Sequence, residues 1–163
     1  MGHAFVDQMM EQNRKGELRS PVSESLDMHL VEFGRGEAVY EMPASPELGN
    51  PLGVIQGGVA TALADAAMAA ATTTILSDEE IKREAITTID LFARFMRPVN
   101  AAKVERLRAE ARVVRAGGRV VWAEADVLAD GEKVGKFTAT GVRVAFDPQA
   151  YVGERGDGNG SQR

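Results

Sequence analysis

The sequence predicts an α+β fold in which an antiparallel sheet of about six strands wraps around one long helix. The helix is predicted because residues 59–71 contain only two polar side chains, and alanine, the strongest helix former, fills most other positions. A helix that is apolar on all sides is normally covered by other elements. Six strand-like segments, joined mainly by hairpin turns, supply that cover, and 163 residues suffice for one domain with a core.

The first 25 residues are predicted to be helical or irregular and to precede the folded domain, which spans residues 26–146. Residues 3–14 are expected to form a short helix with one apolar side, and Pro21 is expected to end the segment that follows. Apolar and polar residues alternate over residues 26–33, which predicts the first strand. After the glycines at 34 and 36, residues 37–42 are expected to return as its hairpin partner.

The long helix is predicted to follow a loop at residues 43–53, which is rich in proline and glycine and brings Asn50 to the helix start. The glycine pair Gly57 and Gly58 lies where the helix begins. Only Thr61 and Asp65 interrupt its apolar run. A buried carboxylate is costly unless it is paired or hydrogen-bonded, so Asp65 is either a structural ion-pair partner or a chemical group.

Four further strands are predicted after a charged connector at residues 77–83. They cover residues 85–97, 104–115, 119–129 and 133–146, and the last is apolar enough to be central in the sheet. Two hairpin turns are expected, one at Gly117-Gly118 and one at Asp130-Gly131. The tail, residues 147–163, contains too little apolar surface to fold and is predicted to be disordered.

Composition excludes several classes of function. The net charge of −5 argues against general nucleic-acid binding, and the absence of cysteine excludes disulfides, thiol nucleophiles and thiolate metal sites. The two histidines, His3 and His29, offer neither a Ser-His-Asp triad nor metal-ligand spacing. No signal peptide or credible membrane span is present. These features predict a soluble cytoplasmic protein that binds no metal and no membrane.

The glycine pair offers chemistry together with Asp65. Amides in the first turn of a helix lack intrahelical acceptors and can stabilise a carbonyl oxygen that gains negative charge. The alternative is that the pair only makes a tight turn. Asp65 lies eight residues beyond Gly57, about 12 Å along the helix axis, so one helix cannot bring both groups to one small carbonyl. If both serve one reaction, a twofold homodimer must supply Gly57 from one subunit and Asp65 from its partner.

These residues also carry a family resemblance. Asn50, Gly53, the Gln56-Gly57-Gly58 turn, the alanine-rich helix with Asp65, and the run ITTIDLFARFMRPV at residues 86–99 resemble a hotdog-fold acyl-CoA thioesterase of the phenylacetate-degradation (PaaI-type) group. The resemblance spans about residues 26–146. That family usually has a histidine where this chain has Gln56, whose amide can still donate a hydrogen bond.

The resemblance implies hydrolysis of a medium-chain or aromatic acyl-CoA, with no cofactor apart from the coenzyme A of the substrate. Asp65 would activate a water or attack the thioester directly, while the Gly57 amide of the partner subunit stabilises the oxyanion. Asn50 would orient the water or the carbonyl, Gln56 would add a donor, and Thr88 would hold the water near the acid. Loop capping remains open for Asn50 and an ordinary strand role for Thr88.

Substrate binding is assigned to three groups of residues. Gly58 belongs to the helix start, and the acyl pocket is expected to include Leu52, Val54, Ala62 and Met68. Arg97, Arg115 and Arg119, from a basic segment at residues 94–119, would bind the nucleotide end of coenzyme A unless they only protect strand edges.

The assembly implied is a homodimer that pairs further into a dimer of dimers. Two alternatives stay open, a non-catalytic acyl-CoA-binding protein on the same scaffold and a hotdog enoyl-CoA hydratase or dehydratase. The second alternative is weakened because such enzymes usually have a catalytic histidine near the helix, and this chain has none there.

Overall fold

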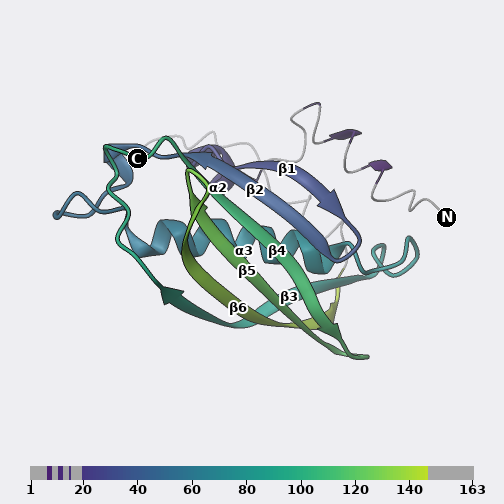
Figure 1. Ribbon diagram of the computed structural model, residues 1–163. Coiled ribbons are helices and arrows are strands. Elements are labelled where there is room, and N and C mark those ends of the chain that lie inside the picture. Colours follow the sequence, from purple (N-terminus) through teal and green to yellow (C-terminus); the bar gives the residue numbers. More distant parts are fainter. Residues whose placement is uncertain (1–6, 9–10, 13–14, 16–19, 147–163) are drawn as a thin grey trace, which may run out of the picture.

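The computed structural model describes residues 7–8, 11–12, 15 and 20–146, and its main body is one curved sheet with a helix on its concave side (Figure 1). The strands and helices of this body are α2 (Pro21–Ser25), β1 (His29–Gly34), β2 (Glu37–Pro43), the 3₁₀ helix η1 (Pro46–Leu48), α3 (Gly57–Thr73), β3 (Glu84–Phe95), β4 (Arg106–Ala116), β5 (Val120–Ala129) and β6 (Glu132–Ala145).

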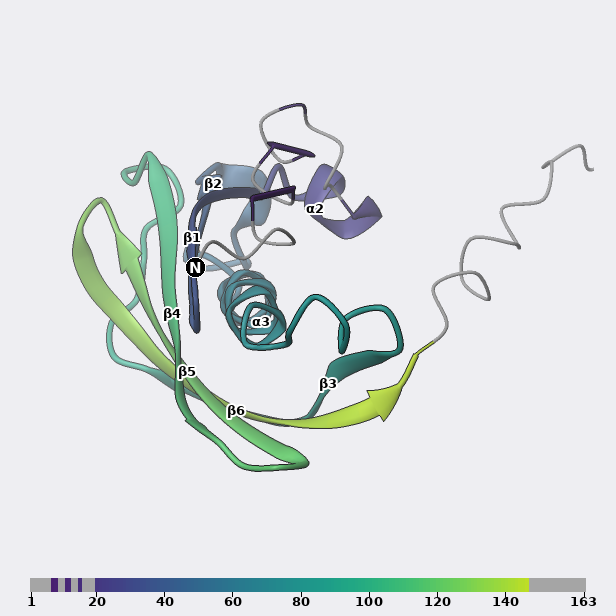
Figure 2. The same ribbon diagram turned by 90° about the vertical axis from the view of Figure 1, so that its right-hand side faces the viewer.

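Six strands form one sheet in the order β1-β2-β4-β5-β6-β3, and every neighbouring pair is antiparallel. Three of the connections are the predicted hairpins, including the turn at Asp130 and Gly131, which both have the positive φ that such a turn requires. The last strand, β6, lies inside the sheet as predicted. Figure 2 looks along α3 and shows the sheet curving around the helix, which confirms the predicted plan of a sheet wrapped around one helix.

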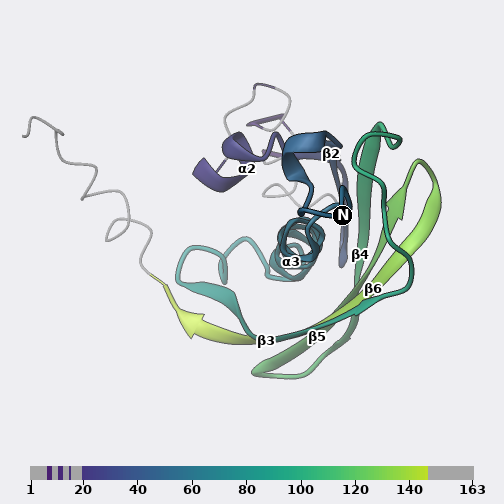
Figure 3. The same cartoon turned by 90° about the vertical axis from the view of Figure 1, so that its left-hand side faces the viewer.

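Only one side of α3 is fully covered in the single chain. The side chains that face the sheet are buried among the inward residues of β4 and β5, and they come from Ala60, Leu63, Ala64, Ala67, Met68, Ala71 and Thr72. On the other side, Thr61, Ala62, Asp65, Ala66, Ala69 and Ala70 are half-buried. The expectation of a helix covered on all sides is therefore met on one side only. Figure 3, from the opposite end, shows no strand across the remaining side.

The end of α3 is fixed by a buried threonine. The Thr74 hydroxyl donates to the Ala71 carbonyl at 2.7 Å and accepts from the Gly36 amide at 2.6 Å. Thr74 has no exposed surface, so these two bonds satisfy groups that water cannot reach. They join the helix end to the β1–β2 turn, where Gly36 has a φ of 77°.

One edge of the sheet is formed by β3, which pairs with β6 alone among the described strands. Its residues are half-buried or exposed along the whole strand. Large apolar side chains lie open along this segment, with Ile89 58% exposed, Phe92 60%, Phe95 55% and, just after the strand, Met96 48%. An unpaired edge strand with exposed apolar side chains is a surface on which another chain can pair.

The N-terminal expectations need correction at two points. Pro21 does not end a segment but opens α2, with Ser20 as the N-cap whose hydroxyl accepts from the Ser23 amide at 3.2 Å. Proline suits the first turn of a helix because its missing amide would have no acceptor there. Residues 26–28 precede β1 instead of belonging to it, since Leu26 caps α2 and Asp27 has a φ of 51°. Of the helix predicted over residues 3–14, the described residues 7–8 and 11–12 are helical. The other residues of that helix and the tail at 147–163 lie outside the described residues.

Candidate active site

The carboxylate of Asp65 lies in the middle of α3, on its partly open side. The Thr88 hydroxyl, on β3, donates a hydrogen bond to Asp65 Oδ1 at 3.2 Å. Asp65 makes no ion pair with a cation of the described residues, so the structural ion-pair explanation for this acid finds no support there. The sequence prediction that Thr88 lies near the acid agrees with this contact. Among the described residues, the second carboxylate oxygen has no hydrogen-bond partner and could bind a water or a substrate.

A β-bulge sets the direction of Thr88. The pairing of β3 with β6 shifts between Thr88 and Asp90, so Ile89 is an extra residue without an opposite partner. Side chains alternate along a strand, and one inserted residue reverses the alternation beyond it. Because of this bulge, both Thr88 and Phe95 lie on the helix side of β3, although their offset of seven positions would place them on opposite faces of a regular strand.

The start of α3 presents two backbone donors. Gln56 is the exposed N-cap residue, and its side-chain amide makes no capping bond and has no other hydrogen-bond partner within the described ranges. Within the described part of the chain, the Gly57 and Gly58 amides have no hydrogen-bond acceptor, as expected for the first turn of a helix. The two glycines differ in their surroundings. A Cβ on Gly57 would lie 2.9 Å from Phe95 Cζ, whereas a Cβ on Gly58 would meet nothing within 4 Å.

Asn50 organises the loop that leads to the helix. Its side-chain oxygen accepts from the Leu52 amide at 2.9 Å and from the Val54 amide at 3.2 Å, and its own amide donates to the Val54 carbonyl at 2.7 Å. The side-chain carbonyl oxygen of Asn50 therefore caps the loop, which is the role that the loop-capping alternative gave to this residue. Only the side-chain NH₂ of Asn50 is left to donate toward a substrate.

An apolar cavity of about 360 Å³ lies beside the start of α3. Its floor is made of fully buried core residues, among them Leu107, Val127 and Phe137. Its open side carries the more exposed members of the lining, namely Asn50, Gly57, Phe95, Met96 and Arg97. Small-molecule sites are typically concave and largely apolar with a few polar groups, and this cavity fits that description.

The acid and the helix-start amides lie apart in the single chain. Asp65 contacts Thr88 near the beginning of β3, and Gly57 faces Phe95 at its end. Neither Asp65 nor Thr88 lines the cavity that contains Gly57. The geometry therefore agrees with the separation of about 12 Å calculated from the rise of a helix.

Of the four residues predicted to line the acyl pocket, one lines the cavity. Val54 lines the cavity, but Leu52 is 85% exposed at the tip of its loop, Met68 is fully buried in the core, and Ala62 is half-buried; none of these three lines the cavity. The sequence missed Phe95, which lines the cavity from β3. No local signal could have found it, because an offset of seven residues from Thr88 predicts the opposite face of a regular strand, and only the bulge at Ile89 places both on one side.

The three predicted arginines do not form one cluster. Arg97 follows β3, lines the cavity and forms an ion pair with Glu132. Arg115 lies on the outer face of the sheet with its guanidinium 5.8 Å from the centre of the Trp122 ring. The backbone of Arg119 pairs with Arg143, which is opposite Ile86 near the beginning of β3 and so at the other end of that strand from Arg97.

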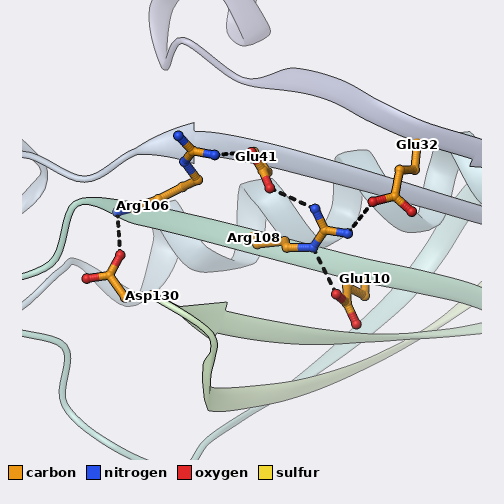
Figure 4. A network of polar contacts seen from close by, with 6 residues as sticks. All are labelled: Glu32, Glu41, Arg106, Arg108, Glu110 and Asp130. Carbon is orange, nitrogen blue, oxygen red and sulfur yellow. Dashed lines mark hydrogen bonds and ion pairs between the residues drawn. The ribbon is translucent and has the colours of Figure 1, made fainter.

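Much of the basic segment is neutralised by acids on neighbouring strands. Figure 4 shows Arg108 between three carboxylates, with bonds of 2.5 Å to Glu32, 2.7 Å to Glu41 and 2.8 Å to Glu110. Burial raises the pKa of Glu41, but the bonds and charges of Arg108 and Arg106 outweigh it and hold that pKa below its usual value. Hydrogen bonds to Glu32 and Glu110 raise the pKa of Arg108. These arginines are bound to protein carboxylates and are poorly placed to take a phosphate.

Two further observations limit the chemistry. The described residues contain no group of three or more His, Asp or Glu side chains with the spacing of a metal site. Within the same residues, no helix combines the length and hydropathy needed to cross a membrane. What the geometry offers is one carboxylate with a neighbouring hydroxyl, and free helix-start amides beside an apolar cavity, which suits hydrolysis at an activated carbonyl.

One helix packed in the concave face of a six-stranded antiparallel sheet, with a carboxylate on that helix, defines a hotdog-fold thioester hydrolase. The model of the thioesterase superfamily matches residues 52–136, more than half of the chain, and the chain belongs to that superfamily. No curated protein matches the chain.

Solved structures agree with this assignment. A phenylacetic acid degradation-related protein from Ralstonia eutropha JMP134 is 28% identical, with a TM-score of 0.69 over 81% of this chain and 97% of that one. The phenylacetic acid degradation protein PaaI from Thermus thermophilus, solved as a mutant, is 26% identical, with a TM-score of 0.68 over 77% and 100%. The PaaI protein of E. coli, at 19% identity and a TM-score of 0.72 over 86% and 96%, shares the fold.

Proposed function

We propose that this thioesterase hydrolyses medium-chain or aromatic acyl-CoAs, with Asp65 as the general base or nucleophile and the Gly57 amide of the partner subunit as the oxyanion donor. As a base, Asp65 takes a proton from water while the resulting hydroxide attacks the thioester carbonyl. The carbon–sulfur bond then breaks, and the proton passes to the departing thiolate, which leaves a free acid and coenzyme A. The reaction uses water and needs no separate cofactor.

The observation that carries this proposal is the environment of Asp65. It is a carboxylate without a cationic partner among the described residues, on the open side of an otherwise apolar helix, with the Thr88 hydroxyl 3.2 Å from one oxygen. A carboxylate left without a cation in such a position favours a chemical role over a purely structural one. The hydroxyl is suited to hold a water beside the second oxygen.

The exposed surface of the single chain supports dimerisation about a twofold axis and, with it, a shared site. The open side of α3 and the free apolar edge of β3 belong to the same part of the surface, because Thr88 of β3 contacts Asp65 of α3. Antiparallel pairing of β3 with a partner's β3 would cover that edge and place the partner's acid near this chain's helix start. A dimer of dimers is part of the proposal as the larger assembly.

Release of free thiol from a panel of acyl-CoAs tests the activity. We expect the wild type to release thiol from at least one medium-chain or aromatic acyl-CoA, and Asp65→Asn to lower kcat by at least about a thousandfold, because the amide cannot take a proton or attack the carbonyl. Ala69→Ser, half-buried four residues further along the same helix, serves as the control.

Two outcomes would contradict parts of the proposal. If the wild type binds acyl-CoAs without releasing thiol above background, the protein is a binding module. If Asp65→Asn keeps full activity, another group performs the base chemistry.

A further inference from the structure

The cavity at the start of α3 belongs to the chain that supplies the glycine amides. Its walls come from the loop before the helix, from the end of β3 and from the inner faces of β4, β5 and β6. Gly57 is on its wall, and the lining is apolar except for Asn50 and Arg97 at the open side. Asp65 and Thr88 are not part of the lining. A group seated in this cavity is therefore held by the chain whose amide it would contact.

Phe95 is the residue of this cavity that packs against Gly57. Its ring atom Cζ would lie 2.9 Å from a Cβ on Gly57, so the ring and the glycine are in direct contact. On its other side, the ring packs edge-to-face against Phe137 with 5.7 Å between ring centres. Gly135 is opposite Phe95 in the sheet, and a Cβ there would lie 2.8 Å from the Phe137 ring. Two glycines therefore make the room that this aromatic pair occupies.

We infer that the acyl group of the substrate occupies this cavity, in the subunit opposite the one that supplies Asp65, and that Phe95 is a specificity-determining residue. The inference rests on the proposed thioesterase function and names its substrate class. The acyl groups accepted are those that are flat or unbranched next to the carbonyl, such as arylacetyl and straight-chain groups.

The position of the ring explains this preference. A carbonyl oxygen that accepts from the Gly57 amide lies about 3 Å from that nitrogen. The first carbons of the acyl group must then pass beside the Phe95 ring, which already touches Gly57. A methyl branch at that position would overlap the ring, whereas an aromatic acyl group can meet its edge or its face favourably. Farther in, the buried floor at Leu107 and Val127 accepts apolar carbon.

The first test compares two substrates that differ by one methyl group beside the carbonyl, phenylacetyl-CoA and 2-phenylpropanoyl-CoA. We expect Phe95→Ala to raise kcat/KM for the branched substrate relative to the unbranched one by at least about tenfold, the usual effect of one methyl group in a pocket. Phe95→Leu should give an intermediate ratio. The matched control is Trp122→Ala, since Trp122 is also a partly exposed aromatic residue, 40% against 55% for Phe95, but lies on the interior strand β5 and does not line the cavity.

The second test asks which subunit holds the acyl group. Heterodimers are purified from two differently tagged chains. In a pair of Asp65→Asn with Phe95→Ala, the only site with an acid uses the unchanged cavity, so wild-type selectivity is expected. When the double variant Asp65→Asn/Phe95→Ala pairs with wild type, the working site uses the altered cavity, so the selectivity of Phe95→Ala is expected.

Defined results would overturn the inference. An unchanged ratio in Phe95→Ala that still hydrolyses phenylacetyl-CoA removes Phe95 as a specificity residue, and reversed selectivities in the two heterodimers place the acyl group with the acid-bearing subunit. If the wild type releases no thiol at all, the proposed function fails. The inference is then decided by calorimetric binding of the same two acyl-CoAs, where Phe95→Ala must still improve the relative affinity for the branched compound.

Discussion

At the scale of single residues, the candidate site depends on contacts between side chains far apart in the sequence. Asp65 and Thr88 are separated by 23 positions, yet a hydrogen bond of 3.2 Å joins them. Asn50 shows the opposite case, since its side-chain oxygen serves the loop around it. The residue type alone did not decide between these roles, because asparagine also favours turns and threonine also favours strands.

Thr88 gives a prediction at this scale. Thr88→Ala should lower kcat by about tenfold, because a water beside Asp65 loses the hydroxyl that orients it. Thr88→Ser should retain most of the activity. The control is Thr87→Ala, on the neighbouring and exposed position of the same strand. Thiol release at saturating substrate measures the effect, and equal loss in the Thr87 and Thr88 variants would indicate damage to β3 instead.

At the scale of the elements, short polar contacts fix the ends of helices and turns. Thr74 connects the end of α3 to the β1–β2 turn through two bonds in a fully buried position. The connector before β3 is fixed by reciprocal bonds between Ser77 and Glu80, in which each backbone amide donates to the other side chain, at 2.8 and 3.2 Å. This is the arrangement of a capping box.

Thr74→Val should lower the free energy of unfolding by about 1–3 kcal/mol, because the substitution keeps the shape but leaves the buried Gly36 amide without its acceptor. Urea unfolding measures this value. Thr73→Val is the matched control, since Thr73 is half-buried and its hydroxyl only donates to the Ala69 carbonyl. Equal costs for the two variants would show that the bond to Gly36 adds nothing.

Glu80 gives a prediction about pH. The Ser77 amide, the Arg143 guanidinium and the Ser77 hydroxyl bind its carboxylate and lower its pKa from 4.5 to about 2. Because the pKa is lower in the folded state, this stabilisation is fully present above pH 4.5 and is lost as the pH falls toward 2. With its side chain 30% exposed, the contribution is about 1 kcal/mol after screening.

Glu80→Gln should therefore lower stability at pH 7 and reduce the loss of stability between about pH 5 and pH 2. Urea unfolding at a series of pH values measures both effects. Glu79→Gln, at a side chain that is 79% exposed and paired with Lys82, should leave the acid dependence unchanged. The assignment to Glu80 is wrong if the two variants lose the same amount over this range.

At the scale of the whole molecule, one surface of the chain is incomplete. The free edge of β3, with Ile89 and Phe92 exposed, lies next to the uncovered side of α3. The rest of the sheet differs, because its outer face toward β1 and β2 carries arginines and glutamates paired with each other. This contrast favours the β3 edge as the surface of the proposed dimer.

A double substitution, Ile89→Lys with Phe92→Lys, should convert the proposed dimer to monomers and abolish thiol release, since lysine on an edge strand opposes pairing and a monomer cannot bring Asp65 to a Gly57 amide. Sedimentation velocity measures the assembly. Val114→Lys is the control, because Val114 is equally exposed, at 60%, but lies on the interior strand β4. A monomeric variant with full activity would exclude the shared site.

Much of this protein was determined by local sequence. The apolar helix, six strands, three hairpin turns and the order of these elements follow from periodicity, alanine content and the glycines, because each of these signals acts within a few residues. The same local reading placed Asp65 on the helix, Gly57 at its start and Asn50 in the loop before it. The spacing of eight residues between Gly57 and Asp65 also set their separation, because the rise of a helix is fixed.

Only the tertiary structure decided which groups meet. The bulge at Ile89 arises from the pairing of β3 with β6, and it brings Thr88 to Asp65 and Phe95 to Gly57. Register also decides the partners of Arg108 and Arg112 in the basic segment, whose acids come from β1, β2 and β5. Cross-strand pairing, bulges and cavities depend on register between distant segments, and no local pattern in the chain encodes that register alone.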